Sequence, residues 1–225
     1  MVNSTFIIFG ASSEIGIEFN RKCVEKNYET FLISRNKIQD THNSKSIIVE
    51  DYLDDFELIN KKIDKYTNKI IIFFNGALYE NRPKKFPNET EIKLTEIANY
   101  IIPYELCKRL HSNNNNIVKF VFISSIAAVK LRYKNFIYGE SKRKLENDVK
   151  TLKPNLFLIF RFGKVFTNMS EGHKTPPFSM TAEQAASIII RKINRKNIVY
   201  PNFGLFFIAQ ILKFTPRKII DILKI

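Results

Sequence analysis

The chain has 225 residues, of which 44% are hydrophobic, and it carries a formal net charge of +14. This length suits one α/β domain with a full core, and the 20 phenylalanines exclude a disordered tail. The two cysteines, Cys23 and Cys107, lack the spacing of a disulfide framework or a metal site, which indicates a reducing cytoplasm.

The basic charge raises nucleic acid, anionic lipid and phosphate-bearing small molecules as partners. The lysines and arginines are spread along the chain, so we rank nucleic acid below small phosphates or a membrane surface. Because the strand-like segment 4–10 begins almost at once, we expect no signal peptide. No apolar run approaches the roughly 20 residues that span a bilayer.

Short apolar runs alternate along the chain with stretches of helical length. The expected strands are residues 5–9, 30–34, 46–49, 69–74, 117–123 and 156–161, and the expected helices are 14–27, 52–66, 89–111, 137–151 and 182–194. Strands that are apolar throughout predict a sheet covered on both faces, and the alternation predicts parallel βαβ units. We therefore predict a single Rossmann-like, doubly wound parallel sheet of about seven strands, formed by residues 1–200 and followed by a helical tail at 201–225.

The turn after the first strand, "FGASSEIG", has the small residues that a phosphate-binding turn needs. Gly10 permits the turn, Gly16 permits close packing of helix on strand, and Ser12 and Ser13 can donate hydrogen bonds. Its position between a strand and a helix favours a dinucleotide pyrophosphate as ligand. A plain βα turn is the alternative.

The end of the second strand indicates which dinucleotide would bind. In nicotinamide-binding folds an acidic residue here holds the ribose of NAD, whereas an arginine accommodates the 2′-phosphate of NADP. Ser34 and Arg35 occupy this position, so we expect NADP(H) to be preferred over NAD(H). A solvated arginine is the alternative. After the third strand, Asp51 would either cap the next helix or accept a hydrogen bond from adenine.

Tyr138 and Lys142 lie four residues apart in "YGESK", at the start of an expected helix. Such a pair shares one helical face. A neighbouring ammonium stabilises a phenolate and so lowers the pKa of tyrosine from its free value of about 10. The pair is either a proton donor of this kind or a partly buried tyrosine beside a solvated lysine.

Together these segments resemble the classical short-chain dehydrogenase/reductase family over residues 4 to about 195. The resemblance also rests on "FFNGAL" at 73–78, on the helix that carries Asn99, on Ser125 thirteen residues before Tyr138, and on "RFGKVFTNM" at 161–169. Two residues depart from the family pattern. Glu14 replaces a glycine of the turn, and Phe162 replaces a proline. We expect the Glu14 side chain to point away from the cofactor, because a carboxylate repels a pyrophosphate.

The resemblance implies a catalytic set and a cofactor set. Tyr138 would be the proton donor, Lys142 would lower its pKa and hold the nicotinamide ribose, Ser125 would bind the substrate oxygen, and Asn99 would support a water between Lys142 and solvent. The cofactor set consists of Gly10, Ser12, Ser13, Ile15, Gly16, Arg35, Asp51, Asn75, Gly76, Ala77, Tyr138, Lys142, Gly163, Val165 and Thr167. No metal is implied.

The resemblance implies an NADPH-dependent oxidoreductase that reduces a ketone or keto-sugar, or oxidises the alcohol. The turn, the short segment 168–180 and the basic tail are similar to a branch that reduces keto-sugars carried on polyprenyl phosphate. The substrate would then be a lipid- or nucleotide-linked sugar in cell-surface polysaccharide precursor synthesis. The alternatives are a soluble carbonyl or 3-oxoacyl reductase and, from another class, a non-catalytic dinucleotide-binding regulatory or scaffold protein. By analogy with the family we expect a homo-oligomer.

The tail, residues 203–225, contains an apolar segment at 203–212 that is too short to span a membrane. Thr215 and Pro216 have the pattern of an N-cap and first helical residue, and a basic amphipathic helix follows, with Arg217, Lys218 and Lys224. Such a helix can lie in a membrane interface, which would place a cytoplasmic enzyme at the inner face of the membrane. The alternative is a helix packed on the domain or on a second subunit.

Overall fold

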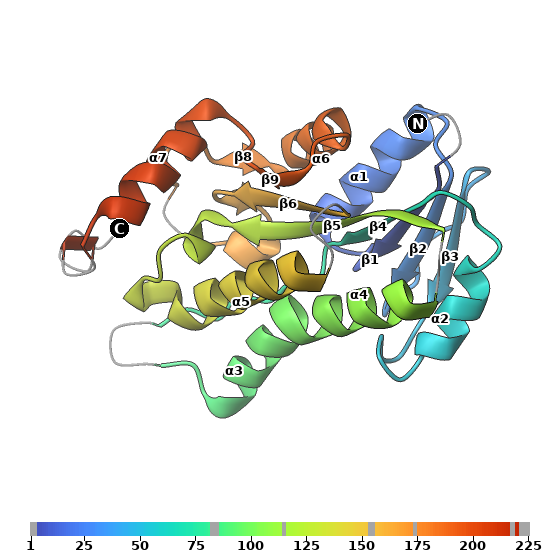
Figure 1. The fold of residues 1–225 in the computed structure, drawn as a ribbon, viewed down its shortest axis with the longest axis horizontal. Coiled ribbons are helices and arrows are strands. Elements are labelled where there is room, and N and C mark those ends of the chain that lie inside the picture. Colours follow the sequence, from blue (N-terminus) through green and yellow to red (C-terminus); the bar gives the residue numbers. More distant parts are fainter. Residues whose placement is uncertain are drawn as a thin grey trace.

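The computed structural model describes residues 4–81, 86–113, 116–152, 156–172, 175–216 and 219–220. Its centre is a seven-stranded parallel sheet in the order β3-β2-β1-β4-β5-β6-β9 (Figure 1). The strands are β1 (Phe6–Phe9), β2 (Thr30–Ser34), β3 (Ser44–Ile48), β4 (Lys69–Phe73), β5 (Ile117–Ser125), β6 (Phe157–Phe162) and β9 (Asn197–Val199). The order reverses between β1 and β4, where a doubly wound sheet binds its ligands. The expected fold class is confirmed.

Helices cover both faces of the sheet. On one face lie α1 (Glu14–Glu25) and α6 (Ala182–Lys192), and on the other lie α2 (Phe56–Ile63), α4 (Ile102–Asn113) and α5 (Phe136–Leu152) (Figure 1). β1, β2 and β4 are buried at every position. Their continuous apolar sequences follow from this two-sided burial.

Stacked aromatic rings hold the three central strands together. The ring centroids of Phe9 and Phe73 are 5.1 Å apart, and those of Phe73 and Phe122 are also 5.1 Å apart. These residues come from β1, β4 and β5 and lie within the core between the sheet and α2, α4 and α5. Offset stacking adds about 0.5–1.5 kcal/mol per pair to the burial of the rings. The stack thus fixes the strands whose carboxyl ends carry the site.

Helix α2 begins at Phe56, four residues later than expected. The Asp51 carboxylate accepts hydrogen bonds from the backbone amides of Leu53, at 2.7 Å, and Asp54, at 3.2 Å. An aspartate that bonds its own backbone in this way favours a turn over a helix. The third strand also lies slightly earlier than expected, at 44–48 rather than 46–49.

The helix expected at 89–111 contains a π-helical turn, Ile97–Ile101, between α3 (Glu89–Glu96) and α4. Pro103 explains the interruption, because a proline has no amide hydrogen to donate to the carbonyl four residues earlier, which is that of Asn99. The backbone amide of Ile102 instead bonds the Ile97 carbonyl, five residues back. π-Helical turns are frequent at functional sites. This one carries Asn99 at its centre.

The last part of the chain folds back onto the sheet. A short parallel pair, β7 (Val165–Phe166) and β8 (Met180–Thr181), precedes α6, and α7 (Phe203–Phe214) follows β9. Leu205, Ala209 and Leu212 of α7 are buried against the domain. No helix within the described ranges has the length and apolar character needed to cross a bilayer.

The helix expected after Thr215 is described only in part. The Thr215 hydroxyl donates back to the Ile211 carbonyl of α7, and the amide of Ile219 bonds the Pro216 carbonyl at 3.1 Å. Arg217, Lys218 and Lys224 lie outside the described residues.

Candidate active site

The turn between β1 and α1 has the geometry of a phosphate cradle. Gly10 adopts a φ of +67°, and a β-carbon at this position would lie 2.8 Å from the amide nitrogen of Asn75. A β-carbon on Gly16 would lie 2.9 Å from the Ala11 carbonyl oxygen. Ser13 caps α1 by accepting a hydrogen bond of 3.1 Å from the Gly16 amide. Only glycine fits at Gly10 and Gly16 without a shift, and the helix N-terminus behind them favours an anion.

At the end of β2 the predicted cofactor-selecting residue is accessible. Arg35 is exposed, and the buried Ser34 beside it donates its hydroxyl to the Asn36 carbonyl. A guanidinium with this exposure is free to meet a 2′-phosphate. Asp51 is also exposed, and one of its oxygens holds the turn described above.

Tyr52 enters the same region, although sequence reasoning missed it. Its ring is buried against Phe9, and its hydroxyl lies close to the backbone of Gly10 and Arg35 and to the side chain of Asn75. Burial raises the pKa of this phenol. Tyr52 thus ties the carboxyl ends of β1, β2 and β4 together. A tyrosine after a strand carries no spacing signal, so the sequence offered no means of finding it.

The segment after β4 lies at the carboxyl end of the sheet, beside Asn99. Asn75 has a buried Oδ1 without a hydrogen-bond partner in the described part of the chain. A β-carbon on Gly76 would lie 3.3 Å from both the Asn99 Oδ1 and the Met169 Cε, so residue 76 must be small. The Ala77 carbonyl accepts a hydrogen bond of 2.6 Å from the Asn99 side chain. Gly76 and Ala77 therefore meet Asn99.

Asn99 is fully buried in the π-helical turn. Its Nδ2 donates to the carbonyls of Ala77, at 2.6 Å, and Thr95, at 2.8 Å. Its Oδ1 has no partner among the described residues. An orphaned buried acceptor requires a donor that the protein does not supply, such as a water. This geometry fits the role expected of Asn99.

Ser125 and Tyr138 meet at the carboxyl end of β5. Their side chains lie close enough to interact, and the Ser125 Oγ accepts a hydrogen bond from the Ala127 amide at 3.2 Å. Burial raises the pKa of Tyr138 to about 12, while the Ser125 hydrogen bond and the Arg132 charge act in the opposite direction. The predicted serine and tyrosine are thus in contact.

Lys142 lies one helical turn beyond Tyr138 and is only 4% exposed, which excludes the solvated-lysine alternative. Its Nζ donates a hydrogen bond of 2.8 Å to the Ile123 carbonyl and lies 5.8 Å from the centre of the Tyr138 ring. Burial lowers the pKa of Lys142 to about 8, and the charge of Glu146 opposes that shift. A buried, weakly paired ammonium beside a phenol has the character of a functional group.

The segment after β6 explains one departure from the family pattern. Phe162 is 2% exposed and stacks on Phe160 at 5.8 Å, so it fills the core where the family has proline. A β-carbon on Gly163 would lie 3.0 Å from Leu205, so this glycine admits α7. The Thr167 hydroxyl makes only a long bond, 3.5 Å, to the Val165 carbonyl, which leaves it free to bind an amide.

Glu14, the other departure from the family pattern, contacts a distant segment of the chain. Its carboxylate accepts a hydrogen bond of 2.8 Å from the backbone amide of Asn168. The residue therefore joins the turn to the segment between β7 and β8, whose described residues, 167–172 and 175–179, we call the lid. Met169 of the lid reaches Gly76, after β4. The lid thus spans the region between the turn and the β4 segment.

Two further charged residues that sequence reasoning missed lie beside the catalytic set. Arg132, in the loop before α5, is partly buried, and burial lowers its pKa while the charges of Glu80 and Tyr138 oppose that shift. Glu146, one turn beyond Lys142, is 2% exposed. Glu146 continues the repeat of four residues from Tyr138 through Lys142, but its charged sequence neighbours are typical of a solvated helix face.

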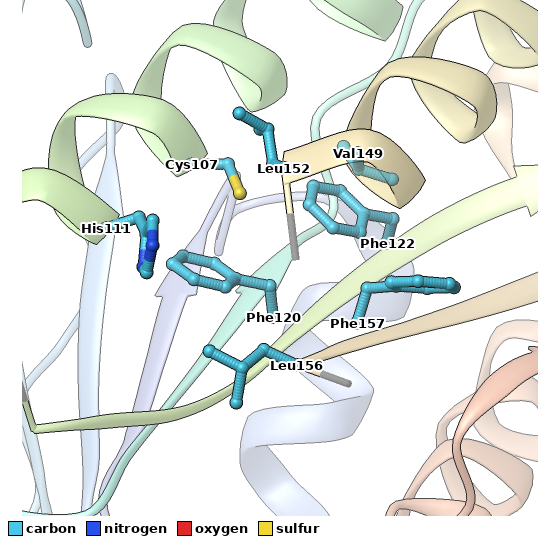
Figure 2. Close-up of a pocket in the computed structure, with 8 residues that line it drawn as sticks. All are labelled: Cys107, His111, Phe120, Phe122, Val149, Leu152, Leu156 and Phe157. Atoms are coloured by element: carbon cyan, nitrogen blue, oxygen red, sulfur yellow. The ribbon is translucent and has the colours of Figure 1, made fainter. Parts of the chain in front are cut away.

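A small cavity lies apart from this site, between α4, α5 and the sheet (Figure 2). Its volume is about 10 Å³, and its lining includes Cys107, Phe120 and Phe157. This space is too small for any ligand larger than a water. Burial raises the pKa of the Cys107 thiol to about 12, so the thiol is inert. Among the described ranges no group of three or more His, Cys, Asp and Glu side chains is placed to hold a metal ion.

The arrangement places a serine, a tyrosine and a lysine together at the carboxyl end of a Rossmann-like sheet. Solved structures share the whole fold. A short-chain dehydrogenase from Burkholderia cenocepacia in complex with NADP superposes with a TM-score of 0.77 at 15% identity, covering 95% of this chain and 98% of its own. An aldohexose dehydrogenase from Thermoplasma acidophilum gives a TM-score of 0.72 at 13% identity, covering 91% and 94%.

A curated relative adds similarity at the level of sequence. An uncharacterized oxidoreductase of Mycobacterium tuberculosis is 32% identical over 104 residues, which is 43% of this chain and 42% of the relative. The match therefore spans less than half of the relative's length. No protein-family model matches the chain. The chain has the fold of the short-chain dehydrogenases, as its motifs predicted.

Proposed function

We propose that this chain is an NADPH-dependent short-chain reductase that transfers a hydride to a ketone or keto-sugar, or oxidises the corresponding alcohol. The observation that carries this proposal is the contact of Tyr138 with Ser125 at the end of β5, with the buried Lys142 one helical turn away. The similarity to dehydrogenases and to a curated oxidoreductase supports it.

The residues of the site fit a nicotinamide dinucleotide. The Gly10 turn leaves no space for a side chain, and the N-terminus of α1 behind it would face the pyrophosphate of the dinucleotide. Asn75 and Asn99 each retain a buried acceptor without a partner among the described residues. The Thr167 hydroxyl is free to bind the carboxamide and Lys142 is placed for the ribose. When bound, the dinucleotide supplies or accepts the hydride.

The protein's own groups handle the proton and the developing charge. A carbonyl that accepts a hydride becomes an alkoxide, which hydrogen-bond donors stabilise where the charge develops. Ser125 and Tyr138 share that position, with Ser125 donating a hydrogen bond and Tyr138 donating the proton. The phenol begins with its pKa raised to about 12, so it needs the nearby ammonium of Lys142 to release a proton near neutral pH.

A preference for NADPH follows from the exposed Arg35 at the end of β2. A guanidinium binds a phosphate through charge-assisted hydrogen bonds, and no acidic residue occupies this strand end to hold an unphosphorylated ribose.

The substrate class is proposed from the lid and from one neighbour in fold. A keto-sugar linked to lipid or nucleotide fits the short lid, and a neighbour with a similar fold is an aldohexose dehydrogenase. A soluble carbonyl or 3-oxoacyl reductase is the second candidate. The two candidate functions use the same catalytic residues and differ only in the carbonyl compound that is reduced.

Steady-state NADPH consumption with a panel of ketones, 3-oxoacyl thioesters and keto-sugars tests the proposal. We expect turnover with at least one member, and the ratio of kcat/KM values identifies the class. If NADPH binds but no carbonyl is reduced and no alcohol oxidised, the non-catalytic regulatory or scaffold role gains support instead.

We also propose that α7 makes a peripheral contact, either with the inner face of a membrane or with a second subunit. Phe203 is 77% exposed, Phe207 56% and Phe214 78%, so the helix presents large aromatic side chains outward. Sedimentation with anionic vesicles compares the wild type with the variant Phe203→Ser/Phe207→Ser. Loss of vesicle binding in the variant favours a membrane, whereas a change in oligomeric state alone favours a subunit contact.

A further inference from the structure

Helix α5 presents a stripe of three polar side chains to the end of β5. Tyr138, Lys142 and Glu146 are spaced by four residues and so share one face. Each contacts one of three consecutive residues of the strand. Tyr138 lies beside the Ser125 side chain, Lys142 donates to the Ile123 carbonyl at 2.8 Å, and Glu146 accepts from the Ser124 hydroxyl at 2.6 Å.

Glu146 is held from a second direction by β6. The Arg161 Nε donates to both carboxylate oxygens of Glu146, at 2.9 and 3.1 Å, and its Nη2 forms an ion pair with Oε2. Ser124 and Arg161 are register partners on neighbouring strands, so their side chains project on the same face of the sheet. Glu146 lies above both. A carboxylate with this many donors has one position.

Glu146 is the charged neighbour that counteracts the burial of Lys142. Both side chains are almost inaccessible, at 2% and 4% exposure. Burial lowers the pKa of the Lys142 ammonium to about 8, and the negative charge of Glu146 raises it. The other charged or titratable groups around the stripe are Tyr138 on α5, Arg161 on β6 and Arg132 in the loop before α5. Both arginines are cations and do not stabilise an ammonium.

We propose that Glu146 is a positioning residue for Lys142, a buried negative charge on the same helical face that keeps the ammonium charged at the end of β5. This inference rests on the proposed reductase function, in which a charged Lys142 is what makes Tyr138 acidic. The bonds from Ser124 and Arg161 supply the rigidity, because they set where the negative charge lies.

Arg161, which binds Glu146 of α5, also connects this helix to the C-terminal segment. The Arg161 Nη1 donates a hydrogen bond of 2.7 Å to the Tyr200 hydroxyl, and the Tyr200 ring packs against Phe206 of α7 at 5.5 Å. A cavity of about 280 Å³ lies beside this series of contacts. Residues of α5, β6 and α7, including Lys213, line it. The position of Arg161, and through it that of Glu146, therefore depends on the docking of α7.

The test is a titration of Lys142 that does not depend on turnover. Lysine carrying ¹³C at the ε-carbon is incorporated, the Lys142 signal is assigned by its loss in Lys142→Arg, and its midpoint is followed by NMR. We expect the midpoint in Glu146→Gln to fall by about 1 pH unit, because an opposite charge at close range shifts a pKa by that order. Glu140→Gln, on the exposed side of the same helix, leaves the midpoint unchanged.

The double variant Glu146→Gln/Arg161→Gln keeps the experiment decisive if the single variant unfolds, because it leaves no unpaired buried guanidinium. We expect its Lys142 midpoint to lie below that of the wild type as well. The alkaline limb of the kcat/KM profile for carbonyl reduction, where Lys142 loses its proton, is expected to move in the same direction in active variants. A folded variant with a wild-type midpoint would overturn the inference, whereas a shifted midpoint without NADPH turnover would refute the proposed function alone.

Discussion

The Glu14 carboxylate accepts a hydrogen bond of 2.8 Å from the backbone amide of Asn168, 154 residues further along the chain. This bond joins the first turn of α1 to the lid. It also places a negative charge beside the turn that is shaped for a pyrophosphate. The bond therefore directs the Glu14 carboxylate toward the lid.

Replacing Glu14 by glutamine should strengthen the binding of NADPH. The neutral side chain can still accept from the Asn168 amide, but it no longer repels the phosphates. We expect Kd to fall by roughly 3- to 10-fold, since one charge near the surface contributes about 1 kcal/mol. Fluorescence titration measures it, with Glu25→Gln at the far end of α1 as the control. Weaker binding in Glu14→Gln would show that the lid contact outweighs the charge.

Gly10 should tolerate no side chain. Its φ of +67° is strained for other residues, and a β-carbon would lie 2.8 Å from the Asn75 nitrogen. We expect Gly10→Ala to destabilise the fold by about 1–3 kcal/mol and to abolish dinucleotide binding. Urea unfolding and NADPH titration measure the two effects. Gly172→Ala is the control, because that glycine also has a positive φ but open space around it. Wild-type NADPH affinity in Gly10→Ala would contradict the proposal that this turn binds the phosphates of the dinucleotide.

Arg35 should determine the choice between NADPH and NADH. Without the guanidinium the 2′-phosphate loses a charge-assisted hydrogen bond, which contributes about 1.5–3 kcal/mol. We expect Arg35→Ala to raise the Kd for NADPH by roughly 10-fold or more and to leave that for NADH nearly unchanged. Isothermal titration with both dinucleotides checks this, and the exposed Lys37→Ala controls for general loss of charge. An equal rise in Kd for NADPH and for NADH would mean that Arg35 does not bind the 2′-phosphate.

Lys142 should make stability depend on pH in the alkaline range. Its pKa is about 8 in the folded chain and near 10.5 when unfolded, so the unfolded state holds the proton between these values. Stability then rises with pH across this window, and below pH 8 the buried charge costs about 3 kcal/mol. We expect Lys142→Met to be more stable than the wild type at pH 7, with a smaller difference at pH 10. Denaturant unfolding at both values measures it, and a difference independent of pH would contradict the assignment.

The fold was accessible to sequence reasoning because its strands are buried on both faces and therefore apolar throughout. Ser125 and Tyr138 were also accessible, since their thirteen-residue spacing crosses one strand end and one helix start. The interruption at Asn99 was missed although Pro103 signals it, because the apolar periodicity continues through the π-helical turn. Tyr52 and the lid contact of Glu14 could not be predicted, since both depend on how distant segments pack together.

Glu146 shows a limit of a different kind. In the sequence it lies among lysines and an asparagine, a pattern typical of a solvated helix face. Its burial follows from Arg161 on β6, which is itself a charged residue within an apolar strand. A buried ion pair hides both partners from hydropathy patterns, because each residue alone indicates solvent exposure.

The central claim is that Tyr138 donates the proton, and the variant Tyr138→Phe tests it most directly. We expect NADPH to bind with nearly wild-type affinity, while kcat/KM for a substrate that the wild type turns over falls by at least about 100-fold, the contribution typical of a general acid. Tyr133→Phe, at a 50% exposed position just before α5, is expected to retain full activity. Substantial turnover by Tyr138→Phe would contradict the account.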